Sequence, residues 1–540
     1  PAAAELLAAE RLRAASGAPL DPAASRGTVT AQVTLSFSLD TETTPLVTYN
    51  VSTDITNFAV DRLLVSQRVE AQTLRVAANN LGYQVRGDVR IGGTPASIEY
   101  RKQRDESDAQ FRLQATLDDA ARSRFGFDLQ GAVSGPVPVK LAGRLGAGAD
   151  QDSRFTVEAD LTQARIENLL PGWIKPAGKP VRAAFTYVGK PKSTRFEDFM
   201  IEGAGTLVRG SIEIDANGEV VAANLPAFAL SDGDKATLKA ERASDGLLKV
   251  TMRGDVYDGR NFIKSSMAGG AREQKNRTPL TDLDLDIRLG AVAGFNGEVL
   301  RGVDLRVVRR GGQVRGFVIN GKVGIEAQLV GELRAGTGGR PVIYLETNDA
   351  GALFRITDTY PGMIGGHMWV AFDPPQPDHG PQEGLLNIRD FAVRGEAALD
   401  RVVAGAPGGR PNGVEFTRLR VEFTRLPGKL ALRDGVVRGP IVGATIDGHI
   451  DYAASDVRLR GTFIPLYGLN NVFGQIPIVG VFLGGDKEGL LGITYEVVGQ
   501  PGRSVLRVNP ISAVAPGVFR KFFEFPSASV ERPPEPFPVR

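Results

Sequence analysis

The chain has 540 residues, and its 64 Lys and Arg side chains nearly balance 62 Asp and Glu side chains, which leaves a formal net charge of +2. So small a charge on so long a chain gives no electrostatic reason to expect nucleic acid as a partner. The sequence contains no cysteine, which excludes disulfides, thiolate metal sites and cysteine catalysis, while 65 Gly and 33 Pro indicate many turns between short strands.

The first segment is the clearest predicted helix. Residues 1–16 read PAAAELLAAERLRAAS, which is rich in strong helix formers, and Gly17 and Pro19 end the pattern. Because the chain begins at Pro1 rather than at a methionine, we expect residues 1–20 to continue from an upstream part of a longer protein.

After this segment, apolar residues recur at every second position. In VTAQVTLSFSL, residues 29–39, the apolar side chains alternate with Thr, Gln and Ser. This period of two predicts a strand with one apolar and one polar face. The same pattern recurs at residues 111–117, 155–161, 283–289 and 457–463.

Helical patterns after the first segment are few and short. They cover residues 163–170, 353–360 and 517–525, and a Pro-Gly pair follows each of the first two. Loops rich in Gly and Pro indicate module boundaries. We expect a helix at 1–20, β-modules at 21–150, 151–275 and 276–375, a C-terminal region at 376–525 and a disordered tail at 526–540.

Residues that often carry chemistry form no convincing site. The histidines, His367, His379 and His449, have no partner at metal-ligand spacing. The stretch from Gly316 to Lys322 is similar to the start of a phosphate loop, but Val323 stands where Ser or Thr should hold magnesium.

An acidic run after residue 280 is equally unconvincing as a metal site. Asp282, Asp284 and Asp286 alternate with Leu283 and Leu285, and the glycine that a calcium loop requires is missing. These carboxylates therefore fit the solvated face of a strand. We expect no enzyme activity, no metal and no cofactor.

Apolar surface is the feature that remains. A sheet with one apolar face must cover that face with helices, with a second sheet or with a ligand. Helical patterns are too scarce to cover so many strands, which leaves closed β-sandwiches or an open, curved sheet that holds an apolar ligand. Periodicity alone does not separate these two architectures.

The most apolar stretch lies near the end of the chain. It reads FIPLYGLNNVFGQIPIVGVFLGGDKEGLLGITYEVVGQ at residues 463–500, and VNPISAVAPGVFRKFFEF follows at residues 508–525. Glycine and proline interrupt it, and no apolar run approaches the roughly 18 residues that span a bilayer. Such a segment must be buried in a core or meet another apolar surface.

This terminal pattern resembles the C-terminal signature of the AsmA-like superfamily of bacterial envelope proteins, in particular its YhdP-like branch. Three upstream stretches are also similar to the family, namely GTVTAQVTLSFSLD, VRGDVRIGGTPASIEY and NDAGALFRITDTYPGMIGGHMWVAF. The resemblance extends over nearly the whole chain from Asp21 onward. The terminal motif is its specific part, because the upstream stretches are general strand-and-turn patterns.

The resemblance implies a mostly β protein whose elongated, curved antiparallel sheets form an apolar groove with few short helices, as in bridge-like lipid transfer proteins. It also implies the periplasmic part of a protein that is anchored in the inner membrane through a segment outside this chain. The expected function is to carry phospholipids along the groove between inner and outer membranes, with other envelope proteins as further partners. The groove candidates are Val29, Val33, Leu35, Phe37, Leu39, Leu283, Leu285 and Ile287.

The apolar terminal segments have two open interpretations. They cap the groove or touch a membrane, with Phe519, Phe522 and Phe523 on one face of a short helix, or they pack on each other as a closing core. The candidates for the cap or membrane contact are Phe463, Leu466, Leu469, Phe473, Ile476, Ile478, Val481, Phe482, Phe519, Phe522, Phe523 and Phe525.

Two other classes of function stay open at this stage. One is a structural or assembly factor for outer-membrane proteins, with a closed β core and no lipid path. The other is a carbohydrate-active or adhesive β-protein, which would need exposed aromatic platforms and paired acids, and only two tryptophans are available, Trp173 and Trp369.

Overall fold

Antiparallel β-strands make up most of the computed structural model. The structure describes residues 2, 5, 23–37, 47–64, 67–106, 108–126, 131–145, 153–167, 169–190, 192–268, 282–336, 339–377, 380–403, 413–465 and 493–509. The chain divides into two compact units, Pro1–Asp258 and Gly259–Arg540, which we call unit 1 and unit 2. Of the described strands, 27 belong to open antiparallel sheet, 14 of them in unit 1 and 13 in unit 2.

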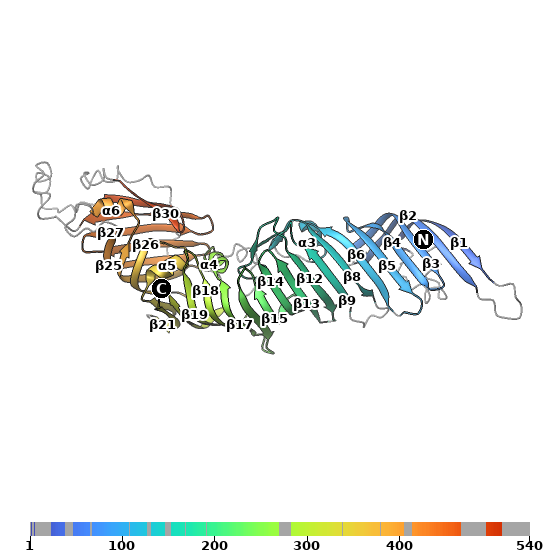
Figure 1. The fold of residues 1–540 in the computed structure, drawn as a ribbon, viewed down its shortest axis with the longest axis horizontal. Helices are drawn as coiled ribbons and strands as arrows, with labels where there is room; N and C mark the ends of the chain where they lie inside the picture. Colours follow the sequence, from blue (N-terminus) through green and yellow to red (C-terminus); the bar gives the residue numbers. More distant parts are fainter. Residues whose placement is uncertain are drawn as a thin grey trace, which may run out of the picture. The chain divides into compact units, whose positions relative to one another are not determined.

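In unit 1, each strand of the main sheet pairs with the next one along the chain, and successive strands are rotated so that the sheet twists (Figure 1). The strands of this sheet are β1 (Ser25–Ser36), β2 (Thr48–Leu64), β3 (Gln67–Asn79), β4 (Gly82–Ile91), β5 (Thr94–Gln103), β6 (Ala109–Leu117), β8 (Val137–Leu145), β9 (Ser153–Asp160), β12 (Arg182–Gly189), β13 (Ser193–Gly203), β14 (Thr206–Asp215), β15 (Val220–Ala229), β16 (Lys235–Arg242) and β17 (Leu248–Asp258). Three short strands, β7 (Val133–Ser134), β10 (Arg165–Glu167) and β11 (Ile174–Lys175), form a separate small sheet.

Unit 2 repeats this meander. Its strands are β18 (Leu283–Ala293), β19 (Val299–Arg310), β20 (Gln313–Val323), β21 (Ala327–Ala335), β22 (Pro341–Thr347), β23 (Met363–Phe372), β24 (Gln382–Val393), β25 (Val414–Leu426), β26 (Lys429–Arg438), β27 (Val442–Asp451), β28 (Asp456–Pro465), β29 (Ile493–Gln500) and β30 (Arg503–Val508). The described helices of the two sheet regions are short, namely α3 (Asp119–Arg124), α4 (Arg260–Met267), α5 (Ala350–Ile356) and α6 (Ala397–Val403). The predicted fold class, mostly β with open, curved antiparallel sheets and few short helices, is therefore confirmed.

The alternation in the sequence explains the two faces of each sheet. In β6, Phe111, Leu113 and Ala115 lie on one face, while Arg112 and Gln114 are exposed on the other. The cross-strand register keeps this phase from strand to strand, because Tyr100, Phe111 and Gly143 are direct partners in β5, β6 and β8. Each sheet therefore has one apolar face and one polar face.

A second layer covers only one end of the apolar face in unit 1. It consists of α3 and the small sheet of β7, β10 and β11, which the chain inserts between strands of the main sheet. Trp173 anchors this layer, since it is 1% exposed and its indole N–H donates to the Thr206 hydroxyl at 3.1 Å. The ammonium group of Lys175 donates to the carbonyl oxygens of Thr162, Ala164 and Pro176 within the same layer.

In unit 2, short insertions serve the same purpose. Helix α5 lies between β22 and β23, and its N-cap residue is Asp349, whose carboxylate accepts from the Ala352 N–H. Buried residues of α5 and α6 pack with the sheet into one core, which includes Ala350, Ile388 and Leu399.

Two helix predictions can be compared with the structure. The helix predicted at 163–170 is wrong, because Arg165–Glu167 is strand β10, with Ile166 fully buried between two exposed charged residues. The helix predicted at 353–360 exists, but α5 begins and ends earlier, at Ala350 and Ile356. The helices predicted at 1–16 and 517–525 lie outside the described residues, apart from residues 2 and 5.

The strands on either side of two predicted module boundaries are hydrogen-bonded neighbours. Strands β8 and β9 pair directly across the boundary at residue 150, and β23 and β24 pair across the one at residue 375. The division between the units falls after Asp258.

Candidate functional site

An apolar row crosses the main sheet of unit 1 near the middle of its strands. The register pairs Val76 of β3 with Val85 of β4, and Val85 with Tyr100 of β5. Each further member of the row is the direct partner of the one before it, up to β14. Its members, which define the central apolar row, are Val76, Val85, Tyr100, Phe111, Gly143, Phe155, Tyr187, Phe196 and Ile212. A continuous apolar strip therefore runs across nine strands without a charged side chain in the row.

In β9 and β13, burial along this face falls from one strand end to the other. In β13, Ile201 is 4% exposed beneath the covering layer, whereas Phe199 and Phe196 are only partly buried. In the same way, Leu161 just after β9 is buried, and Val157 within the strand is partly exposed. In β9, β12 and β13 the half of the apolar face away from the covering layer is thus accessible, and we call it the open apolar half. In β6 the residues at that end, Ala109 and Phe111, are instead buried.

Five aromatic rings gather on the open apolar half where β9, β12 and β13 run side by side. Phe185 meets Phe196 edge to face at 5.2 Å between ring centroids and lies nearly parallel to Phe199 at 6.2 Å. Tyr187 lies 6.4 Å from Phe155 and 6.3 Å from Phe196. All five side chains are partly exposed, so this five-ring cluster is apolar surface rather than sealed core.

Unit 2 has a comparable apolar row. Leu285, Val307 and Phe317 are successive partners, as are Ile287, Leu305 and Ile319 on the same face. The second row continues through Gly331 to Leu345. These side chains are partly buried in β18 to β22, whereas the strands that follow contribute to the closed core with α5 and α6.

The opposite face of unit 1 is polar and carries cross-strand ion pairs. Glu99 of β5 accepts from Arg86 of β4 at 2.8 Å and lies 3.7 Å from Arg112 of β6. The hydrogen bond from Arg86 is the main reason why the pKa of Glu99 is lowered. Because these groups are exposed, such pairs fix the strand register more than they stabilise the fold.

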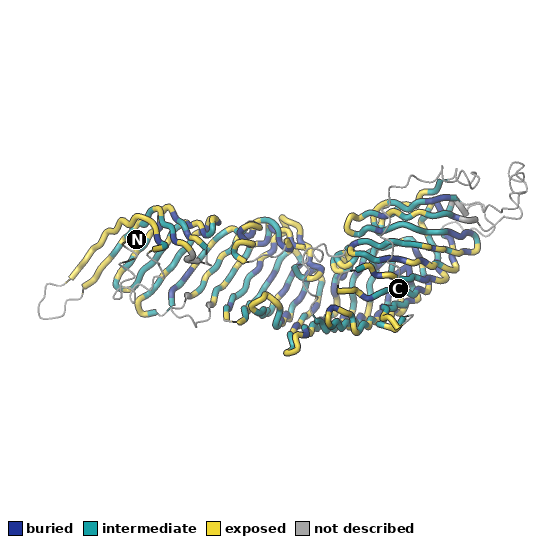
Figure 2. Tube along the Cα trace, turned by 180° about the vertical axis from the view of Figure 1, so that it is seen from behind, coloured by how far each residue is buried: buried dark blue, intermediate teal, exposed yellow. Residues whose placement is uncertain are grey.

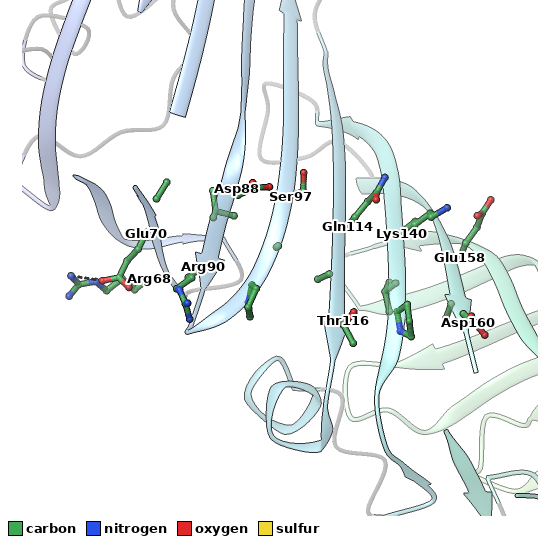
Figure 3. A pocket seen from close by; sticks show the side chains of 18 of the residues that line it. Arg68, Glu70, Asp88, Arg90, Ser97, Gln114, Thr116, Lys140, Glu158 and Asp160 are labelled. Atoms are coloured by element: carbon green, nitrogen blue, oxygen red, sulfur yellow. Dashed lines mark ion pairs between the residues drawn. The ribbon is translucent and has the colours of Figure 1, made fainter. Parts of the chain in front are cut away.

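A groove of about 1410 Å³ lies on this polar face. Figure 3 shows the charged and amide side chains that cross it in a row, and the register makes them direct partners from β4 to β9. The row consists of Asp88, Ser97, Gln114, Lys140 and Glu158. Five basic and four acidic residues line the groove, so it has little net attraction for a charged ligand. We interpret it as the solvated concave side of a twisted sheet.

The predicted groove residues of β1 lie on the apolar face, at its edge. Val29 pairs with Ile55 of β2, and Val33 pairs with Val51. Val29, Val33 and Leu35 are 44%, 56% and 60% exposed, and Figure 2 shows β1 as exposed along nearly its whole length. Phe37 is similarly exposed just after β1, and Leu39 lies outside the described residues.

The predicted groove residues of β18 are partly buried on one face of unit 2. Leu283, Leu285 and Ile287 share this face, while Asp284 on the other face pairs with Arg306 at 3.4 Å. The prediction that the aspartates form the polar side of this strand is confirmed for Asp284.

Phe463 is 4% exposed in β28 and stacks on Tyr495 at 4.2 Å, so it belongs to the closed core of unit 2. Of the two interpretations of the terminal segment, this position fits the closing core rather than the cap or membrane contact. The other candidates for the cap or membrane contact lie outside the described residues, namely Leu466, Leu469, Phe473, Ile476, Ile478, Val481, Phe482, Phe519, Phe522, Phe523 and Phe525.

Sequence reasoning missed the five-ring cluster. Phe155 was part of a predicted strand, but Phe185, Tyr187, Phe196 and Phe199 were not singled out. A usable signal exists in AAFTYV and RFEDFM, where aromatic residues are two or three positions apart on either side of a short turn.

Two further classes of site receive no support within the described ranges. There, no three or more His, Asp and Glu side chains are grouped so that they could hold a metal ion. None of the helices in the described ranges has the length and hydropathy to cross a membrane.

Comparisons of the chain with protein-family models, with curated proteins and with solved structures find no match.

Proposed function

We propose that this chain binds phospholipids along the open apolar half of its sheets and carries them between the inner and outer membranes. The observation that carries the proposal is the central apolar row, which continues through nine strands of unit 1 and is partly exposed at every member except Phe111. The resemblance to AsmA-like proteins supports the same conclusion and suggests a periplasmic location, with the chain anchored in the inner membrane.

The energetic argument concerns the acyl chain. Exposing hydrocarbon to water costs about 0.8 kcal/mol per CH₂ group. A strip that crosses nine strands, each about 4.8 Å from the next, offers apolar contact over roughly 40 Å. The headgroup can stay in water throughout, because the strip is open on one side.

The alternative is an assembly factor with a closed core. One observation favours it for part of unit 2, where α5, α6 and β23 to β29 bury Met368, Ile388 and Phe463 almost completely. For unit 1 the partial exposure of the central apolar row favours lipid binding. The two functions therefore predict different effects of a charged substitution on the apolar face of β9.

Native mass spectrometry of the purified chain tests the proposal. We expect phospholipid bound to the wild type, and loss of most of it from Val157→Asp, which places a charge on the open apolar half. Thr156→Asp is the matched control, because it adds the same charge to the polar face of the same strand. Absence of lipid from the wild type, or equal lipid in both variants, would contradict the proposal.

A further inference from the structure

The five-ring cluster lies close to an exposed basic turn. Tyr187 is three residues before Lys190, which directly follows β12, and Phe196 is four residues after Lys192, which directly precedes β13. At about 3.3 Å per residue, these separations correspond to roughly 10–13 Å along the strands. The turn is closed by the Lys190 N–H, which donates to the Ser193 carbonyl at 2.9 Å.

This turn lies at the open end of the apolar face. At the other end of the same strands, Ala183 and Ile201 are buried beneath the covering layer. Apolar surface and exposed cations thus meet at one end of β12 and β13, where the rings are only partly buried.

The two lysines are available to a ligand. Both side chains are exposed, and within the described part of unit 1 neither ammonium group has a hydrogen bond or an ion pair. Three carboxylates on neighbouring positions are already engaged. Asp215, the register partner of Ser193, accepts from the backbone N–H groups of Asn217 and Glu219, both at 2.9 Å. Glu197 pairs with Arg154 at 3.0 Å, and Glu213 accepts from the Ser193 hydroxyl at 2.9 Å.

We propose that the five-ring cluster and the turn that carries Lys190 and Lys192 form a holding site for one anionic phospholipid. The acyl chains lie on the rings of Phe155, Phe185, Tyr187 and Phe196, and the phosphate lies between the two ammonium groups. The inference rests on the proposed function and adds to it a place and a headgroup class. Flat aromatic surface contributes a large contact area at a low cost in side-chain entropy, which favours this position over the aliphatic parts of the strip.

Photoaffinity labelling tests the site. The purified wild-type chain is incubated with phosphatidylglycerol that carries a diazirine in one acyl chain, and separately with diacylglycerol that carries the same chain. Labelled peptides are then identified by mass spectrometry. We expect both lipids to label peptides that contain Phe155 or residues 185–199.

The headgroup is tested with Lys190→Gln combined with Lys192→Gln. Loss of two phosphate contacts should lower phosphatidylglycerol labelling about tenfold, which is a modest effect for two charge-assisted hydrogen bonds. Diacylglycerol labelling should be unchanged, since that lipid has no phosphate. Lys239→Gln combined with Lys249→Gln is the matched control, because these exposed lysines lie on the polar faces of β16 and β17.

The outcomes separate this inference from the proposed function. Labelling of the wild type elsewhere on the apolar strip, or an equal fall for both lipids in the lysine variant, would overturn the holding site alone. Absence of any labelling in the wild type would overturn both. A melting curve for each variant establishes that the fold is retained.

Discussion

The ring of Phe155 lies directly against the backbone of Gly143, its partner in the neighbouring strand. A Cβ atom at Gly143 would come within 2.5 Å of the Cδ1 atom of Phe155 and 2.4 Å of the Arg154 carbonyl oxygen. Gly143 therefore leaves the space that the ring of Phe155, one member of the five-ring cluster, occupies. We predict that Gly143→Ala lowers the free energy of unfolding by about 1–3 kcal/mol, the usual cost of overpacking.

Urea unfolding of the purified variant measures this effect. Ala142→Ser is the control, because Ala142 is exposed on the polar face one position away, and we expect it to change stability by less than about 0.5 kcal/mol. Equal stability of Gly143→Ala and the wild type would mean that the ring does not depend on the glycine.

A second prediction concerns where the apolar faces are open and where they are closed. Leu35 is 60% exposed in β1, whereas Ile388 is fully buried in β24. Leu35→Asp should leave the melting temperature nearly unchanged, while Ile388→Asp should abolish cooperative unfolding because it buries an unpaired charge. Differential scanning calorimetry of both variants is the test, and a large loss of stability in Leu35→Asp would indicate that β1 is covered in solution.

A third prediction concerns the layer that covers one end of the apolar face in unit 1. Thr206→Val removes the hydroxyl that accepts from the Trp173 indole and should cost about 1–3 kcal/mol, since a buried N–H loses its partner. Thr237→Val is the control, because that hydroxyl is exposed. In a Trp369→Phe background, tryptophan fluorescence reports Trp173 alone, and its emission should shift to the red as the protein unfolds in urea. We expect this shift at a lower urea concentration for Thr206→Val than for the protein that retains Thr206.

The fourth prediction is a pH dependence at the base of α6. Glu396 accepts from the Tyr360 hydroxyl at 2.9 Å, and burial is the main cause of its raised pKa. The folded state therefore favours the neutral carboxyl, so this group's contribution to stability is full below its unfolded pKa and is lost as pH rises through the raised pKa of the folded state.

Glu396→Gln keeps a neutral acceptor for Tyr360 at every pH. We expect the variant to gain stability over the wild type as the pH is raised from 5 to 8, measured as the difference in melting temperature. Glu158→Gln, at an exposed carboxylate, should show no such trend. If the difference in melting temperature between Glu396→Gln and the wild type does not change with pH, the raised pKa of Glu396 is contradicted.

The alternation of side chains made much of the fold predictable. Residues 29–39 and 283–289 were expected as two-faced strands. β18 includes all of 283–289, whereas β1 ends at Ser36 and all its residues from 29 on are exposed. The same signal failed at residues 163–170, where Ile166 is a single buried residue in a strand of three. A strand that short has too few residues to reveal a period.

The high glycine content was only partly understood from the sequence. Glycine was expected in turns, yet Gly143 and Gly384 lie within strands beneath aromatic neighbours. A Cβ atom at Gly384 would meet Phe423 at 2.2 Å and Phe372 at 2.8 Å. The need for glycine at such positions comes from a side chain of the partner strand, which is known only once the register is known. The five-ring cluster could not be predicted for the same reason.

Site-specific photocrosslinking tests the central claim most directly. A photoreactive amino acid replaces Leu113, on the apolar face of β6, or Gln114, its neighbour in the polar groove, and each variant is incubated with phospholipid vesicles. We predict lipid adducts at position 113 and none at position 114. Adducts at position 114 with none at position 113 would assign lipid to the polar face, and no adduct at either position would contradict a lipid path along this sheet.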